Sequence, residues 1–377
     1  MARLSFCLML LRLWFGCVEC CRGDHPEKPE QLAPAVEGLS LSDARRAIVD
    51  DSLDPYFSRL HRLEIAALTG RPVVKGVSLL ESRDEARSRF CDAALGISRS
   101  EQESLQWLVE GVVKRISSSF PLFARQPWRF VKVKSNHCGG FPHTRGFVIF
   151  LNEGIIRRIV ALKQKQDFSA AENAFGTLLF HEQMHVLQRI YPDVFRSLYE
   201  KEFRLVHASV EEHDWIAERR IVNPDATQMN WIVPSRTPGR AYGMVTLLRE
   251  DRDVPRMGAD FYDVAVELQG EKGVYHVVAD DEGVPITHEP FAVPEIRERF
   301  STPRGVDHPN EHAAYRFEQL LRRRYFRDYD EKPGDDSLDG SLQRFDQWCR
   351  AHLIAAVAMP AAPADESSAK EIEERRQ

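Results

Sequence analysis

The chain has 377 residues, of which 43% are hydrophobic, 10% aromatic and 29% charged, and its formal net charge is -6. This is the composition of an ordinary globular protein, and the length suits one large or two modest domains. Collagen-like, coiled-coil and disordered classes are excluded. The excess of acidic residues opposes attraction to phosphate backbones, so nucleic acid is not expected as a partner.

The first residues, 1–22, have the pattern of an export signal. Arg3 supplies a positive start, the stretch Leu4–Val18 is nearly all apolar, and a polar segment with Pro26 follows. A bilayer span needs about 20 apolar residues, and Arg12 interrupts this run. We therefore expect a signal peptide and no stable membrane span, with a periplasmic, cell-envelope or secreted location. The alternative is a buried first helix.

Lipid anchoring has less support in this segment. Gly16 and Cys17 resemble a lipoprotein cleavage site, but Trp14 and Phe15 stand where smaller or aliphatic residues are expected. Four of the seven cysteines lie in the segment, which leaves three for the body of the protein: Cys91, Cys138 and Cys349. Three cysteines allow at most one disulfide, so we do not expect a disulfide scaffold.

The body of the chain changes character several times. Apolar residues at three- and four-residue spacing predict a helical region over 27–125, and aromatic and β-branched runs predict strands at Phe130–Val133 and Phe147–Leu151. Over 236–300 the period returns to two, which predicts an inserted β-meander. Helices are expected again over 301–358. Residues 359–377 have too little apolar surface to order themselves. The expected fold class is therefore α+β.

The segment from His181 to His185 has the form HExxH. Positions four apart on a helix lie about 40° from each other, so His181 and His185 can ligate one ion from one helix face. Glu182 points toward the open side of the same ion, where it can take a proton from water. Two imidazoles with an open tetrahedral position suit zinc, so we expect Zn²⁺ as the cofactor.

Such a pentapeptide arises by chance in roughly 4% of chains of this composition, so its context must decide. Here it lies in a segment with its own predicted helix start, Ser169-x-x-Glu172, and with an apolar stripe that both histidines border. The alternative is a pair of ordinary histidines on a helix surface. The apolar stripe favours a core helix that carries a polar motif.

A third ligand must come from elsewhere. The metzincin extension fails because Gln188 and Tyr191 stand where it requires Gly and His. Nearby acidic candidates are Glu200 and Glu202, and a more distant one is Glu311, in the segment that follows the meander.

The pattern Glu311-x-x-Ala314-x-x-Phe317 resembles the third-ligand helix of the lethal-factor-like gluzincins. The resemblance covers little more than the two metal helices. It implies that Glu311 donates the carboxylate and that Ala314 and Phe317 pack this helix onto the HExxH helix. It also implies a zincin-like catalytic domain over 126–235 and a third-ligand helix within 301–358.

The strand Phe147–Leu151 with its preceding turn is similar to the zincin arrangement in which an edge strand borders the cleft and pairs with an extended peptide. Arg145 lies in that turn, and a tight turn with satisfied side chains is the alternative explanation for it. Asn223-Pro224-Asp225 resembles part of an uncharacterised zincin branch, but the sequence assigns it no role. The residue that would stabilise an oxyanion also stays open, and the candidates are Tyr315, His308, His312 and Arg145.

Three hypotheses follow from the sequence. The first is an exported zinc metallopeptidase in which His181, His185 and Glu311 hold the metal and Glu182 activates water toward a peptide or protein substrate. The second is a catalytically inactive zincin-like envelope binding protein. In the third, HExxH is accidental in an α+β interaction protein, which metal analysis alone would show.

Overall fold

The computed structural model describes four ranges of the chain: 33–249, 252–300, 302–326 and 338–354. From Pro34 onward these residues form one compact unit. The predicted signal peptide and the predicted disordered tail lie outside the described residues. Within the described ranges, no helix has both the length and the apolarity needed to cross a bilayer.

The fold is α+β, as the sequence predicts. The helices are α1 (Leu41–Ala47), α2 (Arg62–Thr69), α3 (Leu79–Ala93), α4 (Arg99–Ile116), α5 (Leu122–Arg125), α6 (Glu153–Gln164), α7 (Phe168–Ala171), α8 (Thr177–Ile190), α9 (Pro192–Lys201), α10 (Asp214–Arg219), α11 (Pro294–Arg299), α12 (Pro309–Arg324) and α13 (Gly340–His352). Five of them, α1 to α5, fall in the region 27–125 that was predicted to be helical, and α12 begins where the third-ligand helix is expected.

The strands form two sheets. The first has five strands: β1 (Val36–Gly38), β2 (Ala94–Leu95), β3 (Trp128–Val133), β4 (His143–Arg145) and β5 (Val148–Asn152). The second has seven: β6 (Val206–His207), β7 (Ser209–Val210), β8 (Trp231–Pro234), β9 (Arg240–Leu248), β10 (Phe261–Glu271), β11 (Val274–Val277) and β12 (Thr287–His288).

The first sheet runs in the order β1-β3-β5-β4. Strands β1, β3 and β5 are parallel, and β4 pairs antiparallel with β5 through His143 opposite Phe150. The sequence placed the edge strand at Phe147–Leu151, and this is wrong, because that segment is the inner strand β5 and β4 lies outside it. Strand β4 could not be predicted from the sequence, because three residues are too few to show the alternation of apolar and polar residues that indicates a strand.

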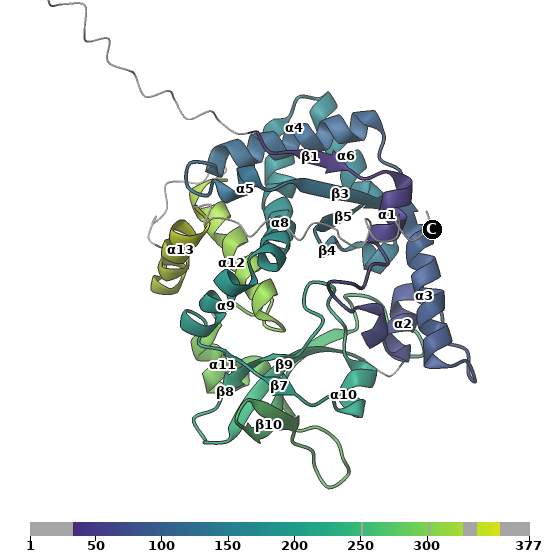
Figure 1. The fold of residues 1–377 in the computed structure, drawn as a ribbon, viewed down its shortest axis with the longest axis vertical. Coiled ribbons are helices and arrows are strands. Elements are labelled where there is room, and N and C mark those ends of the chain that lie inside the picture. The colour runs from purple at the N-terminus through teal and green to yellow at the C-terminus, as the bar shows by residue number, and fades with distance from the viewer. Residues whose placement is uncertain (1–32, 250–251, 301, 327–337, 355–377) are drawn as a thin grey trace, which may run out of the picture. The chain divides into compact units, whose positions relative to one another are not determined.

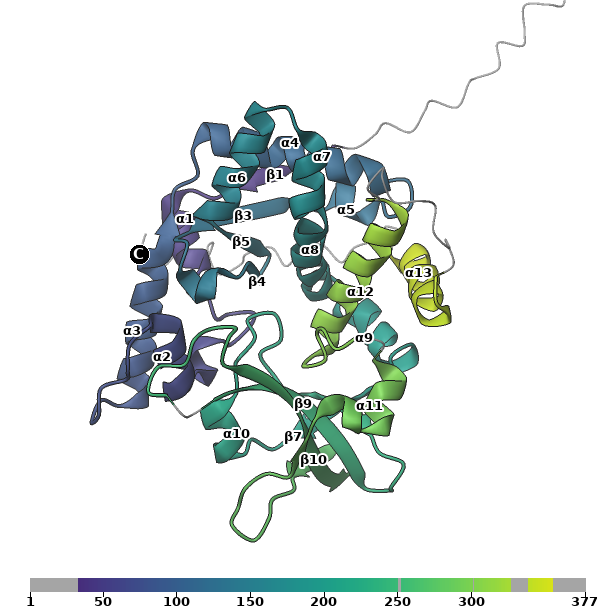
Figure 2. The same cartoon turned by 180° about the vertical axis from the view of Figure 1, so that it is seen from behind.

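The two faces of this sheet pack on different helices, as alternation along each strand requires. Phe130 and Ile149 face a core shared with α4, α6, α8 and α12. Val131 and Phe150 face a second core shared with α1, α2 and α3. In Figures 1 and 2, α4 and α6 lie on one side of the first sheet, and α1, α2 and α3 lie toward its other side.

The second sheet runs in the order β6-β8-β9-β10-β11-β7, with β12 on β10. Its centre is the long antiparallel pair β9 and β10, in register through Met244 and Ala265. The predicted meander is present as β9 to β11, but the sheet begins earlier than 236 because β6, β7 and β8 belong to it. One face has its own core with α10, and Met244 and Ala265 on the other face join the main core.

Helices α8 and α12 lie side by side at the centre of the unit (Figure 1). Ala314 and Phe317 of α12 are fully buried, and the Phe317 ring lies 6.2 Å from that of Phe180 on α8. The packing that the resemblance implied for α12 is therefore present. The predicted helix start at Ser169 is wrong. Asp167 caps α7, and a π turn over 172–176 leads from α7 directly into α8.

Candidate metal centre

Helix α8 carries the HExxH motif on its buried side. His181 and His185 project from one face, and their ring centroids lie 4.9 Å apart. Both side chains are buried, as is Glu182 between them. The four-residue spacing of a helix therefore brings the two imidazoles together as the sequence predicts.

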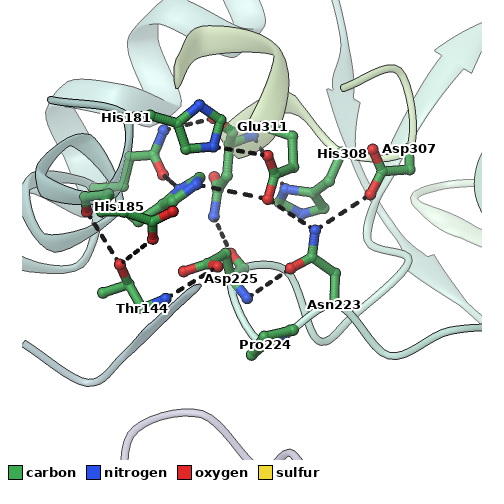
Figure 3. Close-up of polar contacts among 12 residues, drawn as sticks. Thr144, His181, His185, Asn223, Pro224, Asp225, Asp307, His308 and Glu311 are labelled. Carbon is green, nitrogen blue, oxygen red and sulfur yellow. Dashed lines mark hydrogen bonds and ion pairs between the residues drawn. The ribbon is translucent and has the colours of Figure 1, made fainter. Parts of the chain in front are cut away.

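Glu311 reaches the same point from the first turn of α12. One carboxylate oxygen lies 3.2 Å from His181 Nε2, and the other lies 3.5 Å from His185 Nε2 (Figure 3). One ligand atom from each of these three residues lies within 4.8 Å of the other two, a grouping that could hold a metal ion. The alternative ligands Glu200 and Glu202 are exposed on and after α9, and Glu202 lies 4.0 Å from Arg344.

Each imidazole is oriented through its other nitrogen. His181 Nδ1 is hydrogen-bonded to Glu318 Oε1 at 2.8 Å, and His185 Nδ1 to Gln188 Oε1 at 2.8 Å. Gln188 in turn donates from Nε2 to the backbone carbonyl of Asn310 at 2.9 Å, which ties α8 to the start of α12. Partners at Nδ1 fix the ring and leave Nε2 for a metal ion.

The residues fit a divalent metal ion. The donors are two imidazole nitrogens and one carboxylate oxygen, a set that zinc takes in catalytic sites. His185 Nε2 is buried and has no hydrogen-bond partner among the described residues. A buried polar nitrogen without a partner is costly, so a ligand at this position would satisfy it.

The electrostatics of the three residues also suit a cation. Burial alone would raise the pKa of Glu311, but the nearby His185 and His181 outweigh it and hold that pKa well below its ordinary value. For His181, burial acts to lower the pKa, and the hydrogen bonds to Glu311 and Glu318 raise it well above the ordinary value. The Glu311 carboxylate is thus kept ionised in a buried site.

Asn223, in the loop between α10 and β8, fixes the Glu311 carboxylate. Its Nδ2 donates to Glu311 Oε1 at 2.8 Å and lies 3.4 Å from Asp307 Oδ2. Its own side-chain oxygen accepts from the backbone N–H of Asp225 at 2.8 Å, which closes a tight turn around Pro224. This gives the Asn223-Pro224-Asp225 segment a role that the sequence could not assign: it positions the carboxylate of Glu311, the candidate third ligand.

The same loop is joined to α8 and β4 by Arg189. Arg189 donates to the backbone carbonyls of Thr144 at 3.1 Å and Pro224 at 2.9 Å. It also lies 3.3 Å from Asp225 Oδ1 and 2.5 Å from Asp54 Oδ2. Arg189 lies one helical turn beyond His185, so a single buried guanidinium links the metal helix, the edge strand and the loop.

Glu182 is held by Thr144 of β4. The Thr144 hydroxyl lies 2.9 Å from Glu182 Oε2 and 3.1 Å from the Glu182 backbone carbonyl. Burial and then the nearby Asp225 carboxylate raise the pKa of Glu182 to about 8, against the lowering effects of His181 and Thr144. A carboxylate with a raised pKa beside a candidate metal site is typical of a general base.

His181, Glu182, Asn223 and Glu311 line one cleft with a volume of about 510 Å³, whereas His185 lies outside its lining. Its floor includes His181, Glu182 and Glu311, and apolar side chains such as Phe141 and Phe261 border it. Phe141 is 53% exposed, which places an aromatic ring where a ligand could reach it.

The four oxyanion candidates lie in different places. Tyr315 lines the cleft, and its ring lies 4.6 Å from that of His181. His308 caps α12 by accepting from the backbone N–H of Asn310. His312 is buried between the rings of Phe203 and Phe300.

The fourth candidate, Arg145, is also away from the cleft lining. It pairs with Asp51 at 2.9 Å, and its guanidinium stacks over the rings of Tyr56 and Phe57. Among the four, Tyr315 alone lines the cleft. Arg304, which the sequence did not single out, lines it as well.

The edge strand is not open at its centre. The backbone N–H of Thr144 donates to Asp225 Oδ2 at 3.3 Å, and its carbonyl accepts from Arg189. The expected pairing of an extended peptide with this strand is therefore blocked at Thr144 by the protein itself.

Compared with protein-family models, curated proteins and solved structures, the chain matches none of them.

Proposed function

We propose that the protein is an exported zinc-dependent hydrolase of the zincin type and that its substrates are peptides or proteins. The observation that carries the proposal is the convergence of Glu311 with His181 and His185. His185 and Glu311 are separated by 125 residues of the chain, and surface histidines would not require a distant carboxylate. The N-terminal apolar segment supports export.

His181, His185 and Glu311 would hold the ion through two imidazole nitrogens and a carboxylate oxygen. Zinc supplies Lewis-acid chemistry when bound: it lowers the pKa of water and polarises a carbonyl. Glu318 and Gln188 orient the imidazoles, and Asn223 orients the carboxylate.

Glu182 would act as general base and take a proton from the attacking water. Thr144 fixes its carboxylate, and burial raises its pKa into the range where a base can both accept and return a proton. Tyr315, which lines the cleft beside His181, would donate to a developing oxyanion.

Peptides are proposed as substrates because the cleft combines this polar floor with an apolar border. Phe141, Leu178, Val222 and Phe261 offer contacts for apolar side chains. Since Thr144 is closed to strand pairing, a peptide would be held mainly by its side chains.

Glu182→Gln tests the proposal because it keeps the side-chain volume and removes the base. The variant should retain zinc and lose hydrolysis of a denatured protein such as casein by about 10²- to 10⁴-fold. Glu200→Gln, at an exposed position of α9, is the matched control and should hydrolyse as the parent does.

Unchanged hydrolysis in Glu182→Gln would contradict the mechanism. A parent protein that binds zinc and hydrolyses nothing would instead favour the envelope binding protein. If the parent protein binds no zinc, the HExxH motif is accidental.

A further inference from the structure

A second cluster of side chains that could ligate a metal lies in the turn between β3 and β4 and at the first residue of β4. One ring nitrogen each from His137 and His143 and the sulfur of Cys138 lie within 4.8 Å of one another. All three side chains are buried. His137 Nε2 is 3.4 Å from Cys138 Sγ. The cluster shares no residue with the site formed by α8 and α12.

The ring positions are fixed by aromatic packing. His143 stacks on Phe150 of β5 with ring centroids 5.0 Å apart and an interplanar angle of 4°. His137 meets the ring of Phe90 edge to face at 4.4 Å. Because packing already fixes these rings, they lose little conformational entropy when they bind a ligand.

His143 has one nitrogen that the protein does not use. Its Nδ1 lies 3.3 Å from the backbone carbonyl of Phe141. Its Nε2 is buried without a hydrogen-bond partner among the described residues, and the side chain is only 5% exposed. Buried polar atoms in native proteins nearly always have a partner, so this nitrogen points to a missing ligand.

We propose that His137, Cys138 and His143 form a second metal site for a borderline transition-metal ion of the Zn²⁺ class. A thiolate with two imidazoles excludes Mg²⁺ and Ca²⁺, which require oxygen ligands. Binding forms a metal–sulfur bond, the thiol proton leaves to solvent, and nothing is oxidised or reduced. The alternative is a thiol and two imidazoles that merely pack together.

The site would connect to the cleft already described. Cys138 and His143 both line that cleft. Thr144, which follows His143, contacts Glu182. An ion at the second site would therefore hold the start of β4, and with it the strand that positions Glu182. The site itself does not depend on the proposed hydrolysis.

Co²⁺ binding to the full chain tests the site, because thiolate ligation gives a near-ultraviolet charge-transfer band that a site of two imidazoles and a carboxylate cannot give. The thiols of the N-terminal segment must be removed first, so the parent for this experiment has serine at Cys7, Cys17, Cys20 and Cys21 and keeps Cys91, Cys138 and Cys349. Under reducing conditions this parent should show the band and saturate it within two equivalents, because the site at His181 can also take Co²⁺.

Three variants of this parent separate the outcomes. Cys138→Ser should abolish the band, whereas Cys91→Ser, at another free cysteine, should keep it. His181→Ala should also keep the band, because it removes a ligand of the other site only. In His143→Gln, the Co²⁺ affinity measured through the band should fall at least tenfold. This variant replaces Cys138→Ser if circular dichroism shows that Cys138→Ser is not folded.

A parent without the band, or a band that survives in folded Cys138→Ser and in His143→Gln, would overturn the second site. A band that is present while the site at His181 binds nothing would support the second site and contradict the proposed function. The two proposals can therefore fail separately.

Discussion

Two buried carboxyl groups that line the cleft, Glu311 and Glu64, have pKa values shifted in opposite directions. At the end formed by α8 and α12, Glu311 receives a hydrogen bond from Asn223 and faces His181 and His185, and its pKa is held well below the ordinary value. At the other end, Glu64 of α2 is 1% exposed, and burial raises its pKa well above the ordinary value.

The difference lies in the partners and not in the burial. Glu64 accepts one hydrogen bond, from the backbone N–H of Val222 at 2.9 Å, and its second oxygen has no hydrogen-bond partner among the described residues. Burial penalises a charge unless donors and cations compensate it. Of these two carboxyl groups, only Glu311 receives that compensation, so Glu311 stays ionised and ready for a cation while Glu64 keeps its proton.

The largest effect is expected from Glu311→Ala. It removes a ligand, so zinc affinity should fall by more than the roughly 100-fold upper range seen when a supporting residue is lost. Competition with a chromogenic chelator measures this. Glu200→Ala and Glu202→Ala are the matched controls and should bind zinc nearly as the parent does.

The reverse order, with Glu200 or Glu202 essential and Glu311 dispensable, would contradict the ligand set. It would also remove the basis of the resemblance to the lethal-factor-like gluzincins.

A smaller effect is expected from Asn223→Ala. Asn223 orients Glu311 and contacts no other candidate ligand, so zinc affinity should fall by about 10- to 100-fold. The same chelator competition measures it, with Asn173→Ala at an exposed position of the π turn as control. Zinc affinity equal to that of the parent would mean that the Asn223 loop does not position the ligand.

The smallest effect is expected from Glu64→Gln, which tests the other end of the cleft. The raised pKa means that the folded protein keeps the Glu64 proton while the unfolded chain releases it. Stability of the parent is therefore greatest below the ordinary Glu pKa of about 4.3 and falls as pH rises above it. Glutamine does not titrate, so it removes this loss.

Urea unfolding at two pH values measures the effect. At pH 7 Glu64→Gln should be more stable than the parent by about 1 to 3 kcal/mol, and the gain should shrink toward pH 4. Glu282→Gln, in an exposed turn, should show no such change with pH. A variant that is less stable than the parent at pH 7 would show that Glu64 is compensated by contacts beyond Val222.

The metal helices could be predicted from the sequence because their information is local. His181 and His185 need only the period of a helix, and the positions of Ala314 and Phe317 mark the buried face of α12. Glu311 was then indicated by the resemblance of this pattern to a third-ligand helix. The helical region and the meander were predictable for the same reason.

The supporting residues could not be predicted because they act over long separations from loops and short strands. Asn223 and Arg189 gain their roles only when α8, α12 and β4 meet. Strand β4 is too short to show a period, and His312 and Arg145 are polar residues whose burial among aromatic rings no local pattern shows.

The most direct test of the central claim is a zinc-edge anomalous difference map from crystals of the zinc-loaded protein. The structure predicts a peak at the α8–α12 end of the cleft, with Nε2 of His181, Nε2 of His185 and a Glu311 oxygen within about 2.0–2.2 Å. No peak at this end of the cleft, or a peak whose ligands do not include Glu311, would contradict it.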